Sequence, residues 1–189
     1  MNFRRALIVG AILFACTALS ATTTITFTGA TGSFTTWTEG GFAVTATSGI
    51  WRVNDYSFGN PLPSVYCGNC SPGTLEITGG EFTFSSVDLG NPFFSGPASW
   101  PYSFTGFLGG NPVFAQNGTD PAGPISFVTI GSLDPSQVMD TLFISIDTTN
   151  SDGNIDNIVL NAVPEPGTVL LLGSGILGLA GMLRRKINL

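Results

Sequence analysis

The 189-residue sequence contains no histidine and only one lysine, and its six basic residues lie almost entirely at the two ends of the chain. Only Arg52 lies between residues 21 and 162; the other five are Arg4, Arg5, Arg184, Arg185 and Lys186. Nucleic-acid binding needs several Lys or Arg side chains against the phosphates, so a single arginine excludes it. The absence of histidine excludes Ser-His-Asp and Cys-His catalysis, and it removes the commonest nitrogen ligand of zinc.

Acidic residues dominate the central segment instead. Eleven of the twelve lie between residues 21 and 162, and Glu165 is the twelfth. Eleven acids against one base give this segment a net charge of about −10. Such a charge favours solubility and keeps neighbouring copies apart. It leaves carboxylate chemistry and the binding of hard cations as the chemistry open to the segment.

The first twenty residues have the three-part pattern of a secretory signal peptide. Two arginines precede an apolar stretch that is too short for a stable membrane span, and small residues follow at the spacing that signal peptidase accepts. We predict a signal peptide over residues 1–20, with cleavage after Ser20 or the next residue. The sequence LFAC at 13–16 also faintly resembles a lipoprotein box, in which Cys16 would be acylated, although Phe14 is bulky for that box.

The other end of the chain has the pattern of a membrane anchor. Residues 167–183 carry no charge and are mostly Leu, Val, Ile and Gly. Seventeen residues at about 1.5 Å each give roughly 25 Å of helix, at the short end of what spans a bilayer. A basic cluster follows directly, and positive charge stays on the cytoplasmic side, so we predict a transmembrane helix whose preceding residues face outward. Its apolarity on every face disfavours a buried core helix.

Four features occur here in order: Val163-Pro164-Glu165-Pro166, the apolar helix, the basic cluster Arg184, Arg185 and Lys186, and the chain end. Over residues 163–189 they resemble the PEP-CTERM sorting signal of Gram-negative bacteria. The resemblance implies recognition by exosortase, a membrane-embedded cysteine-type enzyme that cuts near the Pro-Glu-Pro and removes the helix. It also implies transient anchoring in the inner membrane, and then a place at the cell surface or outside the cell. Proteins with this signal tend to occur where exopolysaccharide is made, so exopolysaccharide is a candidate partner. Two prolines keep the chain extended where such an enzyme could bind it.

Residues 21–162 have the pattern of one all-β domain. Short runs rich in β-branched and aromatic residues alternate in polarity, as at Phe82 and Phe84, and turn formers such as Gly79-Gly80 separate them. We predict an antiparallel β-sandwich of the jelly-roll type. The runs lie at 22–29, 41–48, 74–78, 81–89, 101–108, 112–116, 125–130, 140–147 and 154–161.

The stretch 140–160 resembles the closing hairpin of bacterial jelly-roll ectodomains, on the sequence Asp156-Asn157-Ile158. Asp147, Asp152 and Asp156 cluster in this stretch, where a calcium ion could bind through oxygen ligands. The loop lacks the EF-hand spacing and its final glutamate. The resemblance implies that a structural calcium sometimes occurs there. A solvated loop is the interpretation that the residues favour, so no cofactor is required and calcium stays open.

Cys67 and Cys70 form the sequence CGNC. The environment of an exported protein is oxidising, and Gly68-Asn69 allows a tight turn, so we predict a structural disulfide. A redox role would need the pair at a helix N-terminus in a βαβ unit, which the sequence does not indicate. A closed zinc site would need carboxylate ligands in addition.

Two further groups have both a functional and an ordinary interpretation. Glu76 and Glu81 are a candidate glycosidase pair, because two carboxylates suffice for that chemistry, but surface acids beside a Gly-Gly turn are favoured. Five aromatic residues could form either a sugar-stacking platform or part of the core, and the core is favoured: Trp37, Trp51, Trp100, Tyr66 and Tyr102.

Three functions follow from these observations. The first is a non-catalytic, structural protein of the cell surface or extracellular matrix. The second is a carbohydrate-binding jelly-roll module, with or without a stabilising calcium ion, which an exposed cluster of aromatics would support. The third is a carboxylate-dependent enzyme, which requires two carboxylates about 5 Å or 6.5–9.5 Å apart in a cleft. We favour the first and do not expect an enzyme.

Overall fold

The chain divides into two compact units, Ala21–Val163 and a second unit made of Met1–Ser20 and Pro164–Leu189. The predicted signal peptide, Cys16 and the basic cluster lie outside the described residues, and so does most of the predicted transmembrane helix. No helix in the described part of the chain is long and apolar enough to cross a membrane. This computed structural model describes residues 21–54, 59, 62–91, 99–120, 126–149, 151–164, 173–176, 178 and 182.

The described part of Ala21–Val163 contains twelve strands, and all their pairings are antiparallel. The domain is therefore all-β, as predicted. The strands are β1 Ala21–Ile25, β2 Ser33–Phe34, β3 Thr36–Glu39, β4 Phe42–Ser48, β5 Trp51–Asn54, β6 Ser64–Gly68, β7 Gly73–Asn91, β8 Pro101–Leu108, β9 Asn111–Thr119, β10 Ser126–Gly131, β11 Val138–Ile146 and β12 Asp152–Ala162.

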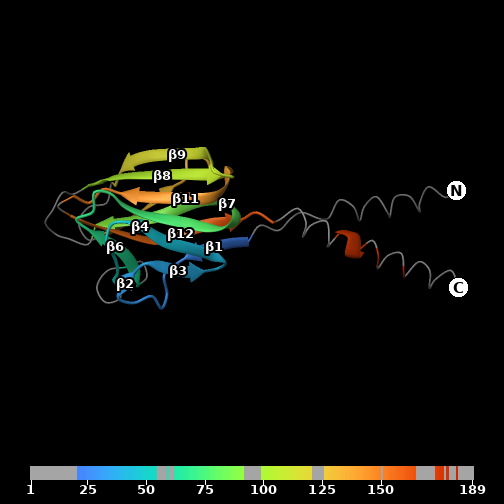
Figure 1. Cartoon of the computed structure of the whole chain (residues 1–189), viewed down its shortest axis with the longest axis horizontal. Helices are drawn as coiled ribbons and strands as arrows, with labels where there is room; N and C mark the ends of the chain where they lie inside the picture. Colours follow the sequence, from blue (N-terminus) through green and yellow to red (C-terminus); the bar gives the residue numbers. More distant parts are fainter. Residues whose placement is uncertain are drawn as a thin grey trace. The chain divides into compact units, whose positions relative to one another are not determined.

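Strand β7 belongs to both halves of the sandwich. The hydrogen-bonded order is β2-β5-β6-β12-β7-β11-β8-β9, and Figure 1 shows β9, β8 and β11 in the succession that this order gives. The part of β7 up to Thr78 pairs with β4 and β11, whereas the part from Phe82 onward pairs mainly with β12 and β10. One long strand therefore joins two groups of strands, which is the arrangement of an antiparallel β-sandwich.

The turn predicted at Gly79-Gly80 is wrong, because β7 runs through both glycines as one strand of 19 residues. The two glycines have φ values of 154° and 82°. A Cβ atom at Gly79 would lie 2.7 Å from the carbonyl oxygen of Gly41, so only glycine fits there. The two glycines form an irregularity within β7 and not a chain reversal. Strands distant in the sequence pair with the parts of β7 before and after them, and this pairing holds both parts in the sheet.

The closing hairpin predicted over residues 140–160 is also wrong. Strand β11 pairs with β7 and β8, and β12 pairs with β1, β6 and β7, so β7 separates the two strands. The physical reason is the length of β7. Its 19 residues offer one edge to β11 and another to β12, so two strands that are neighbours in sequence are not neighbours in the sheet.

The alternating apolar positions form the core, as predicted. The side chains of Phe82, Phe84, Leu142 and Ile144 are completely buried. Aromatic rings pack edge to face within the core, with centroids 5.4 Å apart in both the Phe42–Phe82 pair and the Phe84–Phe104 pair.

Four short strands, β2, β3, β5 and β6, were not predicted. They contain two to five residues each, too few for alternation to stand out in the sequence. Strand β6 pairs with β5 on one edge and with β12 on the other, which gives a three-stranded surface.

Candidate ligand-binding site

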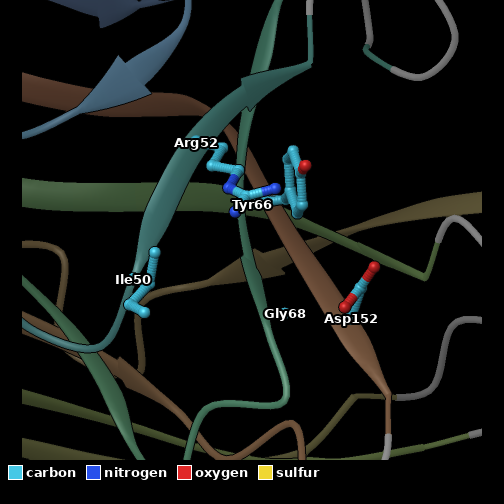
Figure 2. A pocket seen from close by; sticks show the side chains of 5 residues that line it. All are labelled: Ile50, Arg52, Tyr66, Gly68 and Asp152. Atoms are coloured by element: carbon cyan, nitrogen blue, oxygen red, sulfur yellow. The ribbon is translucent and has the colours of Figure 1, made fainter.

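An open hollow of about 340 Å³ lies on the surface of β5, β6 and β12, lined by Ile50, Arg52, Tyr66, Gly68 and Asp152 (Figure 2). The sheet register brings these residues together. Arg52 on β5 is the cross-strand partner of Tyr66 on β6, and Gly68, two residues further along β6, is the partner of Asp152 on β12. Figure 2 shows the Tyr66 ring beside the Arg52 guanidinium, with Asp152 on the strand beyond Gly68.

The alternation of side chains along each strand places this group on the outer face. Trp51 lies between Ile50 and Arg52 in the sequence, Val65 precedes Tyr66, and Cys67 follows it. All three are buried in the core. Because successive side chains point to opposite faces of a strand, Arg52 and Tyr66 face away from that core. The same local pattern that buries the apolar residues therefore exposes the polar ones.

Gly68 leaves the space that the hollow occupies. A Cβ atom at this position would lie 2.6 Å from Oδ1 of Asp152, so any side chain here would displace the Asp152 carboxylate. Ile50, which precedes β5, is 72% exposed and gives the hollow an apolar rim.

The turn after β6 is held by a disulfide and by hydrogen bonds to the segment before β12. Cys67 and Cys70 are joined, with Cα atoms 5.9 Å apart. The Cys70 N–H donates to Oγ1 of Thr148 at 3.0 Å, and the Thr148 hydroxyl donates to the Cys67 carbonyl at 3.1 Å. The Asn69 N–H also donates to the Ser151 carbonyl at 2.7 Å. These contacts fix the ends of β6 and β12 that carry the hollow.

The polar groups of the hollow are not saturated by the protein. Within the described residues, no hydrogen bond or ion pair holds the side chain of Arg52, Tyr66 or Asp152. Partial burial raises the pKa of the Asp152 carboxyl above its ordinary value, and the Arg52 guanidinium opposes that shift. The hollow therefore offers a cation, a phenol and a carboxylate to a ligand.

The three calcium candidates do not form the cluster that the sequence suggested. Oδ1 of Asp147 accepts the N–H and hydroxyl of Thr149, at 3.2 and 2.7 Å. Asp152 lines the hollow, while Asp156 is fully buried opposite Asp88. Positions four apart on one strand are separated by about 13 Å, which keeps the last two acids apart. Among the described residues, no group of three or more His, Cys, Asp or Glu side chains is placed to hold a metal ion.

The other sequence candidates lie elsewhere. Glu76 and Glu81 lie on β7, on either side of the glycine pair, and Glu81 is exposed. Of the five candidate aromatics, Tyr66 alone lines the hollow. The other four are buried in the core or packed against it: Trp37, Trp51, Trp100 and Tyr102.

Sequence reasoning did not select Arg52, Ile50 or Gly68 as site residues. One signal was available, because Arg52 is the single basic residue in a segment of net charge about −10. Nothing in the sequence indicated that it lies beside Tyr66, because that contact depends on the pairing of β5 with β6.

The folded domain ends directly before the Pro-Glu-Pro of the sorting motif. Strand β12 ends at Ala162, and the Val163 N–H then donates to the Glu81 carbonyl at 2.8 Å. Pro164 is the last described residue of the motif, since Glu165 and Pro166 lie outside the described part.

The family model for the PEP-CTERM protein-sorting motif matches residues 162–186. The chain therefore carries this sorting signal, which implies export, processing by exosortase at the membrane and a surface location afterwards. No curated protein matches the sequence.

Several solved structures are similar in fold. A DUF4465 family protein from Bacteroides caccae has a TM-score of 0.50 and 10% identity, over 74% of this chain and 98% of that chain. The family 32 carbohydrate-binding module of C. perfringens NanJ, solved with galactose, has a TM-score of 0.47 and 14% identity, over 75% and 100%. A family 29 carbohydrate-binding module from Piromyces equi has a TM-score of 0.45 and 11% identity, over 76% and 91%. At 10% identity, the likeness to the DUF4465 family protein concerns the fold alone.

Proposed function

We propose that this chain is an exported, non-catalytic protein of the cell surface or extracellular matrix, and that its β-sandwich is the part that remains after processing. The supporting observation is where the domain ends. The last strand stops at Ala162, the Val163 N–H bonds to the Glu81 carbonyl, and Pro164 begins the Pro-Glu-Pro sequence. A cut near the Pro-Glu-Pro therefore leaves every described strand of the sandwich in place.

The proposal includes three parts that remain predictions from the sequence. They are a signal peptide over residues 1–20, a transmembrane helix over residues 167–183 as a temporary anchor, and the jelly-roll topology of the sandwich. The net charge of about −10 is consistent with a soluble domain outside the cell.

A second candidate function is the binding of carbohydrate, and a specific observation favours it. Arg52, Tyr66 and Asp152 converge on one open hollow, where their polar atoms have no hydrogen-bond partner among the described residues. Unsaturated polar groups beside an aromatic ring suit a ligand with both hydroxyl groups and apolar faces, as sugars have. Exopolysaccharide is the partner that we propose for this function.

The sorting part is tested by replacing Pro164, Glu165 and Pro166 together with alanine in the native host. We expect the variant to stay at full length in the inner membrane, while the unaltered chain leaves it and loses its C-terminal residues. Immunoblots of membrane and external fractions, with mass spectrometry of the released C-terminus, measure both properties.

A matched control replaces Ile187, Asn188 and Leu189 with alanine, because these residues follow the matched part of the motif. The control should be released like the unaltered chain. If the Pro-Glu-Pro variant were also released and shortened normally, the sorting proposal would be wrong.

A further inference from the structure

The size of the hollow limits what it can hold. A volume of about 340 Å³ lies at the lower end of the range for small-ligand sites, which is roughly 300–1,000 Å³. The hollow is open to solvent and is shaped by four residues on three adjoining strands and by Ile50, which precedes β5. It therefore suits one sugar residue of a longer chain better than a long segment of that chain.

The polar groups of the hollow can bond to sugar hydroxyl groups. The Asp152 carboxylate can accept two hydrogen bonds, one at each oxygen, and the Arg52 guanidinium donates from a planar fork. Hydroxyls of a sugar ring both donate and accept, so different hydroxyls of one ring can bond to Asp152 and to Arg52 on the two sides of β6. The Tyr66 ring beside Arg52 supplies an apolar face against which the C–H groups of the sugar can pack.

Charge decides between neutral and acidic sugars. Arg52 and the ionised Asp152 cancel each other within the hollow. The surrounding domain carries a net charge of about −10, which repels a polyanion that approaches it. An uncharged sugar meets no such repulsion.

We propose that the hollow formed by Ile50, Arg52, Tyr66, Gly68 and Asp152 binds one uncharged sugar residue of a polysaccharide. Asp152 and Arg52 bond to hydroxyl groups of this sugar, and the Tyr66 ring packs against it. This inference rests on the proposed carbohydrate-binding function, and it adds the place and the chemical class of the ligand.

The test uses the full chain in a detergent without a sugar headgroup. Binding is measured by isothermal titration and by NMR chemical-shift changes, with galactose, glucose and mannose oligosaccharides as neutral probes and oligogalacturonate and oligoglucuronate as acidic probes. We expect a neutral probe to bind, with shift changes centred on residues 50–52, 66–68 and 152. We expect the acidic probes to bind at least roughly tenfold more weakly at low salt, because salt no longer screens the repulsion.

Two variants separate the site from the rest of the surface. Gly68→Ala fills the hollow and displaces the Asp152 carboxylate without removing a polar group. Gly131→Ala is its control, because a Cβ atom at Gly131 would meet nothing within 4 Å. Asp152→Asn removes one charge from the hollow, and its control Glu81→Gln removes one charge at an exposed position of β7. We expect each site variant to weaken binding about tenfold or more and each control to leave it unchanged.

The outcomes are distinguishable. If no probe binds at all, carbohydrate binding itself is wrong, while the sorting experiment still stands on its own. If a neutral probe binds but the Gly68 and Asp152 variants bind it equally well, the site is wrong. If acidic probes bind more tightly than neutral ones, the ligand class is wrong. Thermal unfolding of each variant shows that any loss of binding occurs in folded protein.

Discussion

Two half-buried carboxylates of the sandwich have opposite surroundings. Glu39 on β3 accepts four hydrogen bonds, from the N–H and hydroxyl of Thr26, the N–H of Phe27 and Nε1 of Trp37, all at 2.9–3.0 Å. The side chain of Asp152 on β12 accepts none from the described residues, and burial raises its pKa against the opposing effect of the Arg52 guanidinium.

The contrast separates a structural carboxylate from one that is available to a ligand. Phe27 is fully buried at a φ of 56°, an uncommon conformation for a bulky residue, and Glu39 holds its N–H in place. Glu39 therefore stabilises a strained part of the fold. Asp152 holds no such segment through hydrogen bonds of its side chain to the described residues.

The largest expected effect is that of Glu39→Ala. The substitution removes the oxygen that accepts the N–H groups of Thr26, Phe27 and Trp37, and buried donors left unsatisfied cost about 1–3 kcal/mol each. We expect the free energy of unfolding to fall by roughly 2–4 kcal/mol in urea denaturation. Glu81→Ala, at an exposed position, is the control and should change it little. If the Glu39 variant were as stable as the control, Glu39 would not be a structural carboxylate.

The next effect in size is the loss of the disulfide. In the Cys67→Ala/Cys70→Ala variant the cross-linked loop is short, so we expect a loss of about 2 kcal/mol in stability. The hydrogen bonds through Thr148 would still hold part of the turn. Alkylation and mass spectrometry of the exported protein, denatured without reductant, should find Cys67 and Cys70 unmodified. Alkylated cysteines in that material would show that the pair is not formed.

A smaller effect concerns the pH dependence of Asp152. Its folded-state pKa is raised, so between the ordinary value of 3.8 and the folded value the native state binds more protons than the unfolded chain. The stability contribution of Asp152 therefore rises as the pH falls through this window, and above it the ionised form is a cost. Asp152→Asn should be slightly more stable than the unaltered protein at pH 7, and the difference should close as the pH falls below 3.8.

Urea midpoints measured from about pH 7 to about pH 3.5 test this dependence. Arg52→Gln is the companion variant, because it removes the charge that lowers the Asp152 pKa and should therefore make the protein less stable at pH 7. An Asp152→Asn variant that is clearly less stable than the unaltered protein at pH 7 would show that Asp152 is a structural group like Glu39.

The smallest expected effect is that of divalent cations. Asp147, Asp152 and Asp156 lie apart, so we expect calcium and magnesium at equal ionic strength to raise the melting temperature by similar, small amounts through screening alone. Thermal unfolding in each cation measures this. A rise specific to calcium that grows with its concentration, and that Asp152→Asn abolishes, would mean that Asp152 is a metal ligand and not a free carboxylate.

Several features of this protein depend only on residues that are close together in the sequence, so they could be predicted from it. The sorting signal at residues 162–186 is a linear motif, read in the order of its residues, and no folding is needed to recognise it. The buried faces at Phe82, Phe84, Leu142 and Ile144 result from alternation with a period of two, which each strand imposes on its own residues. The close spacing of Cys67 and Cys70 pointed to their pairing in the same way.

Which strands are neighbours, by contrast, depends on pairing between distant segments. Strand β7 passes through Gly79-Gly80 and separates β11 from β12, because pairing energy comes from partners distant in the sequence and overrides the local preference of two glycines for a turn. The candidate site has the same origin. Arg52, Tyr66 and Asp152 meet because β5, β6 and β12 pair in one register, and the two shorter strands contain too few residues for a sequence pattern to indicate them.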